Sequence, residues 1–222
     1  GVFTITGSTV LYGDIITNNQ TITFNNAVAL RDDSVLSSGN GNIVFGGTVD
    51  SYNSTPHKLT LLSTGGSISF GGDIGDAYAL DAVSITSAGA LTLPSINAAT
   101  FLARTTGAAA DLTIASGSVL TASGAGEALT LAAGRNFINS SGSGAISLTG
   151  GGRWLVYSTT PSADTFGSLN SNNTAIWNTA YGGVIGQAGN RYVFLYQPTV
   201  TFTSTDDSKT YGTDATASVA TD

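Results

Sequence analysis

Acidic residues are the first candidates for chemistry in this chain, because paired carboxylates hydrolyse glycosidic bonds and clustered carboxylates bind calcium. A glycosidase needs two carboxylates at a defined separation across one cleft, whereas a polysaccharide lyase typically needs clustered acids and a basic residue. The candidates are Asp32 and Asp33 beside Arg31, then Asp50, Asp73, Asp76 and Asp81. Asp50 and Asp73 are expected near corners of successive repeats. No Arg or Lys pair accompanies them, so we expect solvated corner residues that keep a surface with few charges soluble.

His57 is the only histidine and therefore the one imidazole that could activate a serine nucleophile. It lies in the segment Ser54–Lys58, which we expect to be a turn entering a strand. A catalytic triad would need an acid that orients His57 and a serine that faces it, so an exposed loop histidine is the favoured interpretation. Phosphate-binding Gly-Lys-Ser/Thr loops and complete Gly-Gly-x-Gly-x-Asp calcium repeats are absent. We predict no catalytic, cofactor-binding or metal-binding residues, no cofactor and no enzymatic activity.

Threonine recurs at the centre of short apolar triplets, where it would face outward from a stack of strands. Flat ranks of threonine on such a stack can order ice-like water; the members here are Thr60, Thr92, Thr113 and Thr130. Serine mixes into the rank at Ser69, Ser84 and Ser147. Threonine suits any exposed strand face, so ice binding is the less favoured interpretation.

Composition and charge narrow the possible partners. The 222 residues carry a formal net charge of −7, and the seven Lys and Arg residues are scattered singly, so nucleic acid is a poor partner. Without Cys, the chain has no disulfide, thiolate metal site or cysteine nucleophile. The apolar runs are too short to cross a membrane. Because the chain lacks Met and opens on Gly1, we expect a processed product or an excerpt of a longer polypeptide.

The elements that would position these residues are indicated by a seven-residue pattern that occurs three times, at residues 22–28, 43–49 and 68–74. Each copy has an apolar residue, a variable one, an aromatic, two small residues, any residue and an aliphatic. This order predicts a strand, a corner and the start of a second strand. We expect the small residues, such as the Gly-Gly pairs, to supply the positive φ values that tight corners need.

Apolar-polar-apolar triplets form a second repeating family. Their alternation predicts strands whose outer two residues face inward and whose central Thr or Ser faces outward. The triplets are Leu59–Leu61, Val83–Ile85, Leu91–Leu93, Leu112–Ile114, Leu129–Leu131 and Ile146–Leu148. Such short strands are stable only when stacked, which favours a parallel β-helix. A sandwich or an up-and-down barrel would need hairpin turns between adjacent strands, and the single Asn-Gly at Asn40–Gly41 precedes one strand instead.

The composition changes after residues 150–152, which are all Gly. Arg153–Tyr157 and Arg191–Tyr196 are aromatic strands that both begin with Arg followed by an aromatic residue. Bulky aromatics suit the end of a solenoid, where the open cross-section must be filled, and a small hairpin packed on the side is the alternative. A further strand is predicted at Thr199–Thr203, before an unfinished motif at Lys209–Gly212.

These segments together resemble filamentous-haemagglutinin-like exoproteins, which are large adhesins exported by two-partner secretion. The repeats Asn42–Asp50 and Ser67–Gly75 resemble the repeats of that family's shaft, which is a right-handed parallel β-helix. The region from Gly152 to Phe194, followed by Thr201–Thr203 and Lys209–Gly212, is similar to the junction where such shafts pass into YDG or MBG surface repeats.

The resemblance implies an all-β chain in three parts: a parallel β-helix rod at residues 1–150, an aromatic cap-like junction at 151–197, and the start of a β module at 198–222. It also implies an extracellular or cell-surface location and an outer-membrane pore as export partner. The expected function is a structural and adhesive segment of a bacterial surface fibre, which attaches to host or surface glycans and proteins or to like chains. The alternatives are a carbohydrate-active β-helix enzyme and a subunit of a head-to-tail filament.

Overall fold

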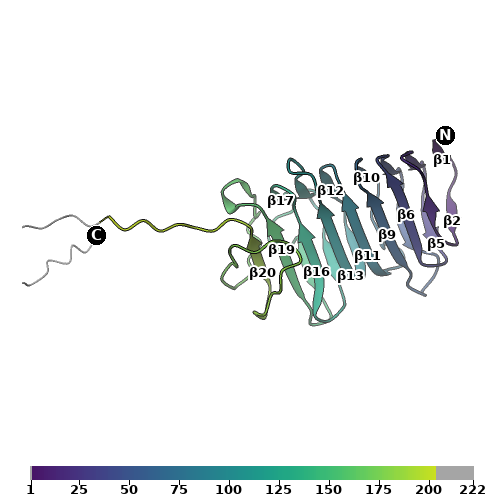
Figure 1. Cartoon of the computed structure of the whole chain (residues 1–222). Coiled ribbons are helices and arrows are strands. Elements are labelled where there is room, and N and C mark those ends of the chain that lie inside the picture. Colours follow the sequence, from purple (N-terminus) through teal and green to yellow (C-terminus); the bar gives the residue numbers. More distant parts are fainter. Residues whose placement is uncertain (1, 204–222) are drawn as a thin grey trace, which may run out of the picture.

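The computed structural model describes residues 2–203, and its strands form a rod of stacked, parallel β-strands (Figure 1). The stack starts with β1 and β2 near the N-terminus and ends with β20. Every ladder between its named strands is parallel. The prediction of an all-β, right-handed parallel β-helix is confirmed. Within the described part, the only helical element is a 3-10 turn at Pro161–Ala163.

Each coil of the rod contributes to three faces. The first face contains β1 (Phe3–Ile5), β4 (Ile22–Phe24), β7 (Ile43–Phe45), β10 (Ile68–Phe70), β12 (Leu91–Leu93), β14 (Leu112–Ile114) and β17 (Phe137–Asn139). The second face contains β2 (Thr9–Leu11), β5 (Val28–Leu30), β8 (Val49–Ser51), the start of β13 (Ile96–Thr105), β15 (Leu120–Ala122) and β18 (Ile146–Leu148). The third face contains β3 (Ile15–Ile16), β6 (Ser34–Gly39), β9 (Lys58–Ser63), β11 (Leu80–Ser87), the rest of β13, β16 (Glu127–Ala132), β19 (Arg153–Ser158) and β20 (Arg191–Phe194).

Inward-facing side chains stack in columns because successive strands are in register. On the third face one column is formed by Leu36, Leu61, Ile85, Ala103, Leu131 and Val156, all of them buried. On the first face the rings of Phe24, Phe45 and Phe70 stack almost parallel, with centroids 5.3 and 5.6 Å apart. These columns fill the interior, and each coil buries the apolar surface of its neighbour.

The Gly-Gly corners serve a different purpose from the one predicted. Gly46 and Gly71 do not have positive φ, so the prediction that these corners need a left-handed backbone is wrong. A Cβ on Gly46 would lie 2.6 Å from the carbonyl oxygen of Asn25, and one on Gly71 would lie 2.8 Å from that of Gly46. Glycine is therefore required because the backbones of successive coils approach closely at this corner.

Residues beyond 150 continue the same stack. The strands β19 and β20 pair in parallel on the third face, so Arg153–Ser158 and Arg191–Phe194 do not form a hairpin. Aromatic rings cluster at this end of the rod: Tyr192 lies between Phe166, 4.7 Å away, and Trp154, 5.0 Å away, measured between ring centroids.

The strand predicted at Thr199–Thr203 is wrong, because the structure shows irregular backbone there. Phe202 is 91% exposed and lacks a neighbouring strand in the described part of the chain, and an extended segment without a ladder is not a strand. The motif at Lys209–Gly212, and with it most of the module expected at 198–222, lies outside the described residues.

Candidate functional site

The aspartates that suggested glycoside chemistry hold successive coils together. The Asp33 carboxylate accepts a hydrogen bond from the backbone N–H of Lys58 at 2.8 Å. In the same way, Asp50 accepts from Ala77 at 2.9 Å and Asp73 accepts from Ser95 at 3.0 Å. Each contact joins one coil to the next, from a corner at Asp33 and Asp73 and from the middle of β8 at Asp50, so the expectation of solvated corner carboxylates is incomplete. An ionised carboxylate that accepts a backbone N–H makes a charge-assisted hydrogen bond, which is stronger than a neutral one.

The remaining aspartates are dispersed. Asp32 accepts the N–H of its neighbour Asp33, and Asp81 lies 3.8 Å from the Lys58 ammonium. Asp76 is exposed at the second face. Among residues 2–203, no three His, Cys, Asp or Glu side chains gather in a way that would hold a metal ion.

His57 is less exposed than predicted. Only 17% of its side chain is accessible, and its Nδ1 lies 3.9 Å from an oxygen of Asp33. The nearby hydroxyl of Ser51 accepts the backbone N–H of His57 and donates to the carbonyl of Ala79. This serine therefore bonds to main chain and not to the imidazole, so the described contacts do not form a Ser-His-Asp relay.

The outward threonines divide between two faces. Thr92 and Thr113 are direct neighbours on the first face, in β12 and β14. Thr60 and Thr130 lie on the third face, where Ser84 and Leu102 separate them in the register. The structure thus does not bring the four threonines into one rank.

A different region of the third face is distinctive: residues 174–188, here called the flap, fold back over the outside of the sheet. Their first part pairs with the last strand, since Ile176 donates to the Tyr192 carbonyl at 2.9 Å and accepts from Phe194 at 2.8 Å. Thr179 also donates to the carbonyl of Phe194 at 3.1 Å. The flap therefore covers the edge of β20 that β19 leaves free.

Beneath the flap lies a small second core on the outer side of the sheet. Leu155 and Val193 are fully buried, and Tyr157 is 6% exposed. They pack with Ala132 and with Ile185 from the flap. These outward-facing positions are buried because the flap removes them from water.

Two arginines fix the flap to the sheet, and each is the first residue of its strand. Arg153 donates to the carbonyl oxygens of Ile185, at 3.1 Å, and Gln187. Arg191 donates to the carbonyl of Thr174 at 2.7 Å and to that of Ala188 at 3.0 Å. Arg191 thus holds both ends of the flap, while Arg153 holds its returning limb.

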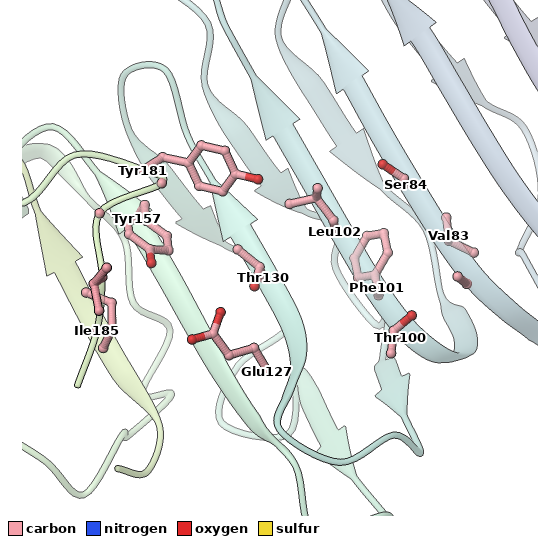
Figure 2. Close-up of a pocket in the computed structure, with 14 residues that line it drawn as sticks. Val83, Ser84, Thr100, Phe101, Leu102, Glu127, Thr130, Tyr157, Tyr181 and Ile185 are labelled. Carbon is pink, nitrogen blue, oxygen red and sulfur yellow. The ribbon is translucent and has the colours of Figure 1, made fainter. Parts of the chain in front are cut away.

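A groove of about 560 Å³ runs between the flap and the outer side of the sheet (Figure 2). Its floor includes Ser84, Leu102 and Thr130, which are aligned in the register of β11, β13 and β16. Figure 2 shows Tyr157 and Tyr181 on the flap side of this floor and Ser84 on the opposite side. The groove therefore has hydroxyl groups along its base and aromatic rings along one wall.

The charged groups around the groove are few and are already paired. Glu127 is the only acid among the described residues that line it, and its carboxylate binds the Arg153 guanidinium at 2.5 Å. The guanidinium of Arg104 lies over the Tyr181 ring, 4.9 Å from its centroid. Burial, and to a lesser extent the nearby Glu127 carboxylate, raise the pKa of Tyr157, so its phenol is a hydrogen-bond donor at neutral pH.

This arrangement suits binding better than bond cleavage. The groove offers hydroxyls, amphipathic rings and one carboxylate, which are groups that recognise a polar ligand by hydrogen bonds and stacking. Acid–base hydrolysis of a glycoside would use two carboxylates, and this groove presents one.

The sequence did not single out Glu127, Tyr157 or Tyr181 as site residues. A signal for the flap was present, because both arginines that hold it begin the Arg-aromatic pairs at Arg153 and Arg191. The groove floor gave no such signal, since Ser84 and Thr130 belong to the same triplets as the rest of the rod.

No family model matches this chain, and neither a curated protein nor a solved structure is significantly similar to it. Within the described residues, there is no helix with the length and apolar character needed to cross a membrane.

Proposed function

We propose that this chain is a structural and adhesive segment of a large bacterial surface fibre, secreted through an outer-membrane pore. The observation that carries the proposal is the continuous parallel stack from β3 to β20 on the third face. Stacked strands extend a rod by about 4.8 Å per coil, so the length and the side surface of the rod grow with the number of coils. The repeats that resemble filamentous-haemagglutinin-like shafts support the extracellular location.

The side-chain contacts between coils support a mechanical role. The carboxylates of Asp33, Asp50 and Asp73 tie successive coils together. Buried hydroxyls add to these ties: Ser51 and Ser63 donate to the carbonyls of Ala79 and Gly41, each in a neighbouring coil. The acids that an enzyme of this fold would use are thus engaged in holding the rod together, which favours the adhesive segment over a carbohydrate-active enzyme.

The experiment that tests the proposal measures attachment directly. Beads coated with the whole chain are flowed over mammalian cells and over a bacterial lawn, and retention is compared with beads coated with the same chain after irreversible heat denaturation. We expect the folded chain to retain several-fold more beads. Equal retention of folded-chain and denatured-chain beads on both surfaces would contradict an adhesive role. Release of reducing sugar from polysaccharide by the folded chain would also contradict it.

The location is tested separately in cells of the producing organism. Antibodies raised against the whole chain should label the outside of intact cells, or fibres that extend from them, in immunogold electron microscopy. Labelling that appears only after the cells are permeabilised would exclude a surface fibre.

A further inference from the structure

We propose that the groove between the flap and the third face binds a neutral glycan chain lying across β11, β13 and β16. The proposal deepens the adhesive function and rests on it for its biological role, because it names the class of ligand that the rod would hold at a surface. It is carried by three features of the groove: the spacing of its floor, the support of its aromatic wall and its charge.

The floor repeats at the spacing of the strands. Ser84, Leu102 and Thr130 occupy equivalent positions on neighbouring strands, which lie about 4.8 Å apart. This step is close to the length of one pyranose unit, so an extended oligosaccharide can place successive rings over successive strands. The hydroxyls of Ser84 and Thr130 can each donate and accept hydrogen bonds, as sugar hydroxyls do.

The aromatic wall is held in place before any ligand arrives. Tyr181 is 39% exposed, and its ring packs edge-on against Tyr157 with centroids 5.5 Å apart. Arg104 lies over the same ring. Because Arg153 and Arg191 fix the limbs of the flap, the ring is positioned by contacts on several sides. A preorganised ring can bind the C–H face of a sugar at a small cost in conformational entropy.

The charge of the groove selects a neutral ligand. Glu127 is its only acid in the described part, and the chain as a whole has a formal net charge of −7. The two guanidinium groups beside the groove are engaged within the protein, Arg153 with Glu127 and Arg104 with the Tyr181 ring, and the net charge of the chain disfavours an anionic glycan. A neutral sugar can donate hydroxyl protons to the free lone pairs of Glu127. Arg153 neutralises part of the carboxylate charge without removing its acceptor atoms.

The test uses four neutral hexasaccharides as probes: cellohexaose, laminarihexaose, chitohexaose and maltohexaose. Binding to the whole chain is measured by isothermal titration calorimetry and by saturation-transfer NMR. We expect at least one hexasaccharide to bind with a dissociation constant below 1 mM, a value at the weak end of the range of specific affinities. Hexagalacturonate, an anionic probe, should bind at least tenfold more weakly.

Two variants place the ligand in the groove. Tyr181→Ala removes the exposed ring and should weaken binding at least tenfold, whereas Ser84→Trp fills the floor on the side away from the flap and should abolish binding. Tyr78→Ala is the matched control, because Tyr78 is 47% exposed and is not among the residues that line the groove. Circular dichroism checks that each variant keeps the fold, and Ser84→Trp tests the groove even if Tyr181→Ala loosens the flap.

Three results would overturn the proposal: no binding of any neutral hexasaccharide, unchanged binding in Ser84→Trp, or tighter binding of hexagalacturonate. Soluble probes need no surface, so the two proposals can fail separately. Hexasaccharide binding without bead retention would count against the adhesive function alone. Bead retention that persists in Ser84→Trp would leave adhesion intact and remove the groove from it.

Discussion

The third face of the rod is built in two ways, and β6 and β19 show the difference. In β6 buried and half-buried residues alternate from Ser34 to Gly39, as expected for a strand with one side in the core. In β19 every residue from Trp154 to Ser158 is buried. Both strands belong to the same sheet, but of the two only β19 lies beneath the flap.

The comparison shows that strict alternation marks a strand with one solvated side, whereas a continuous apolar run marks a strand covered on both sides. In β19 the apolar run Trp154–Tyr157 therefore indicates a second layer on the outside of the rod. The layer also changes what the surface can bind, because the flap turns an otherwise flat sheet face into the floor of a groove.

The largest effect is expected from a cavity in the inner core of the regular coils. Phe45 is 2% exposed and stacks between Phe24 and Phe70, so Phe45→Ala removes two ring contacts and leaves a cavity. We expect a loss of about 3–5 kcal/mol in the free energy of unfolding, measured by urea denaturation. The outward neighbour Val44 is half-buried, and Val44→Ala should cost about 1 kcal/mol or less. Similar losses for the two variants would show that the stacked rings do not dominate this part of the core.

A smaller, more local effect is expected in the second core beneath the flap. Leu155 is fully buried, and Leu155→Ala should cost about 2–5 kcal/mol, confined to the last coils because a solenoid transmits stability mainly between neighbours. Hydrogen exchange should accelerate in peptides that cover residues 174–194 and stay unchanged in β4 and β7.

Leu102 gives the matched control, since it occupies the same outward column but is only half-buried. Leu102→Ala should cost about 1 kcal/mol or less. If Leu102→Ala and Leu155→Ala destabilise equally, the flap does not form a separate core.

The regular coils were predictable from the sequence because their physics is local. Triplets such as Leu59–Leu61 show directly which side chains face inward, and repeated corners show where the chain turns. The stacking of short strands then follows from the need to bury both ends of each triplet. The aromatic strands at Arg153–Tyr157 and Arg191–Tyr196 were also recognised as a distinct region.

The contacts between coils were not predictable, because they depend on register. Whether Asp50 meets the backbone of Ala77 is decided by how far one coil is rotated against the next, and repeat offsets of 21 and 25 residues leave that open. The groove was hidden for a similar reason: Ser84 and Tyr181 are far apart in sequence and meet only when the flap folds back. Residues 174–188 have no regular alternation, so their place is set by tertiary contacts with Arg153 and Arg191.

The arginines provide a sharper test of how the flap is held. Hydrogen bonds from charged donors contribute about 1.5–3 kcal/mol, so Arg153→Ala should raise the exchange rate of amides in residues 174–188 about tenfold or more. Arg191→Ala should do the same, because it frees both limbs of the flap.

Arg31→Ala is the control for the loss of a guanidinium. Arg31 stacks over Tyr52 at a corner of the N-terminal coils, 4.5 Å from the ring centroid. Its removal should leave exchange in the flap unchanged. Unchanged exchange in Arg153→Ala as well would mean that apolar contacts alone hold the flap.

The smallest effects concern pH, and the contributions of Asp111 and Asp164 to stability should change with pH in opposite directions. At the corner of β14, the Arg135 guanidinium holds the pKa of Asp111 below its usual range, so the stability from this pair is lost as pH falls from about 4 through the lowered pKa. In the last coils, burial raises the pKa of Asp164, although the Ser158 hydroxyl and the Phe137 N–H partly oppose this.

The stability that protonated Asp164 gives is therefore present below about pH 4 and is lost as pH rises through the raised pKa. In thermal melts at half-unit steps from pH 3 to pH 7, the melting temperature of Asp164→Asn should rise relative to that of the native chain as pH rises. The melting temperature of Asp111→Asn should instead fall relative to that of the native chain as pH rises, because the native pair forms only when Asp111 is ionised. Parallel curves for both variants would mean that the two carboxylates do not differ in environment. Opposite slopes would show that burial in the last coils makes the charge of Asp164 costly, whereas the Arg135 guanidinium stabilises the charge of Asp111.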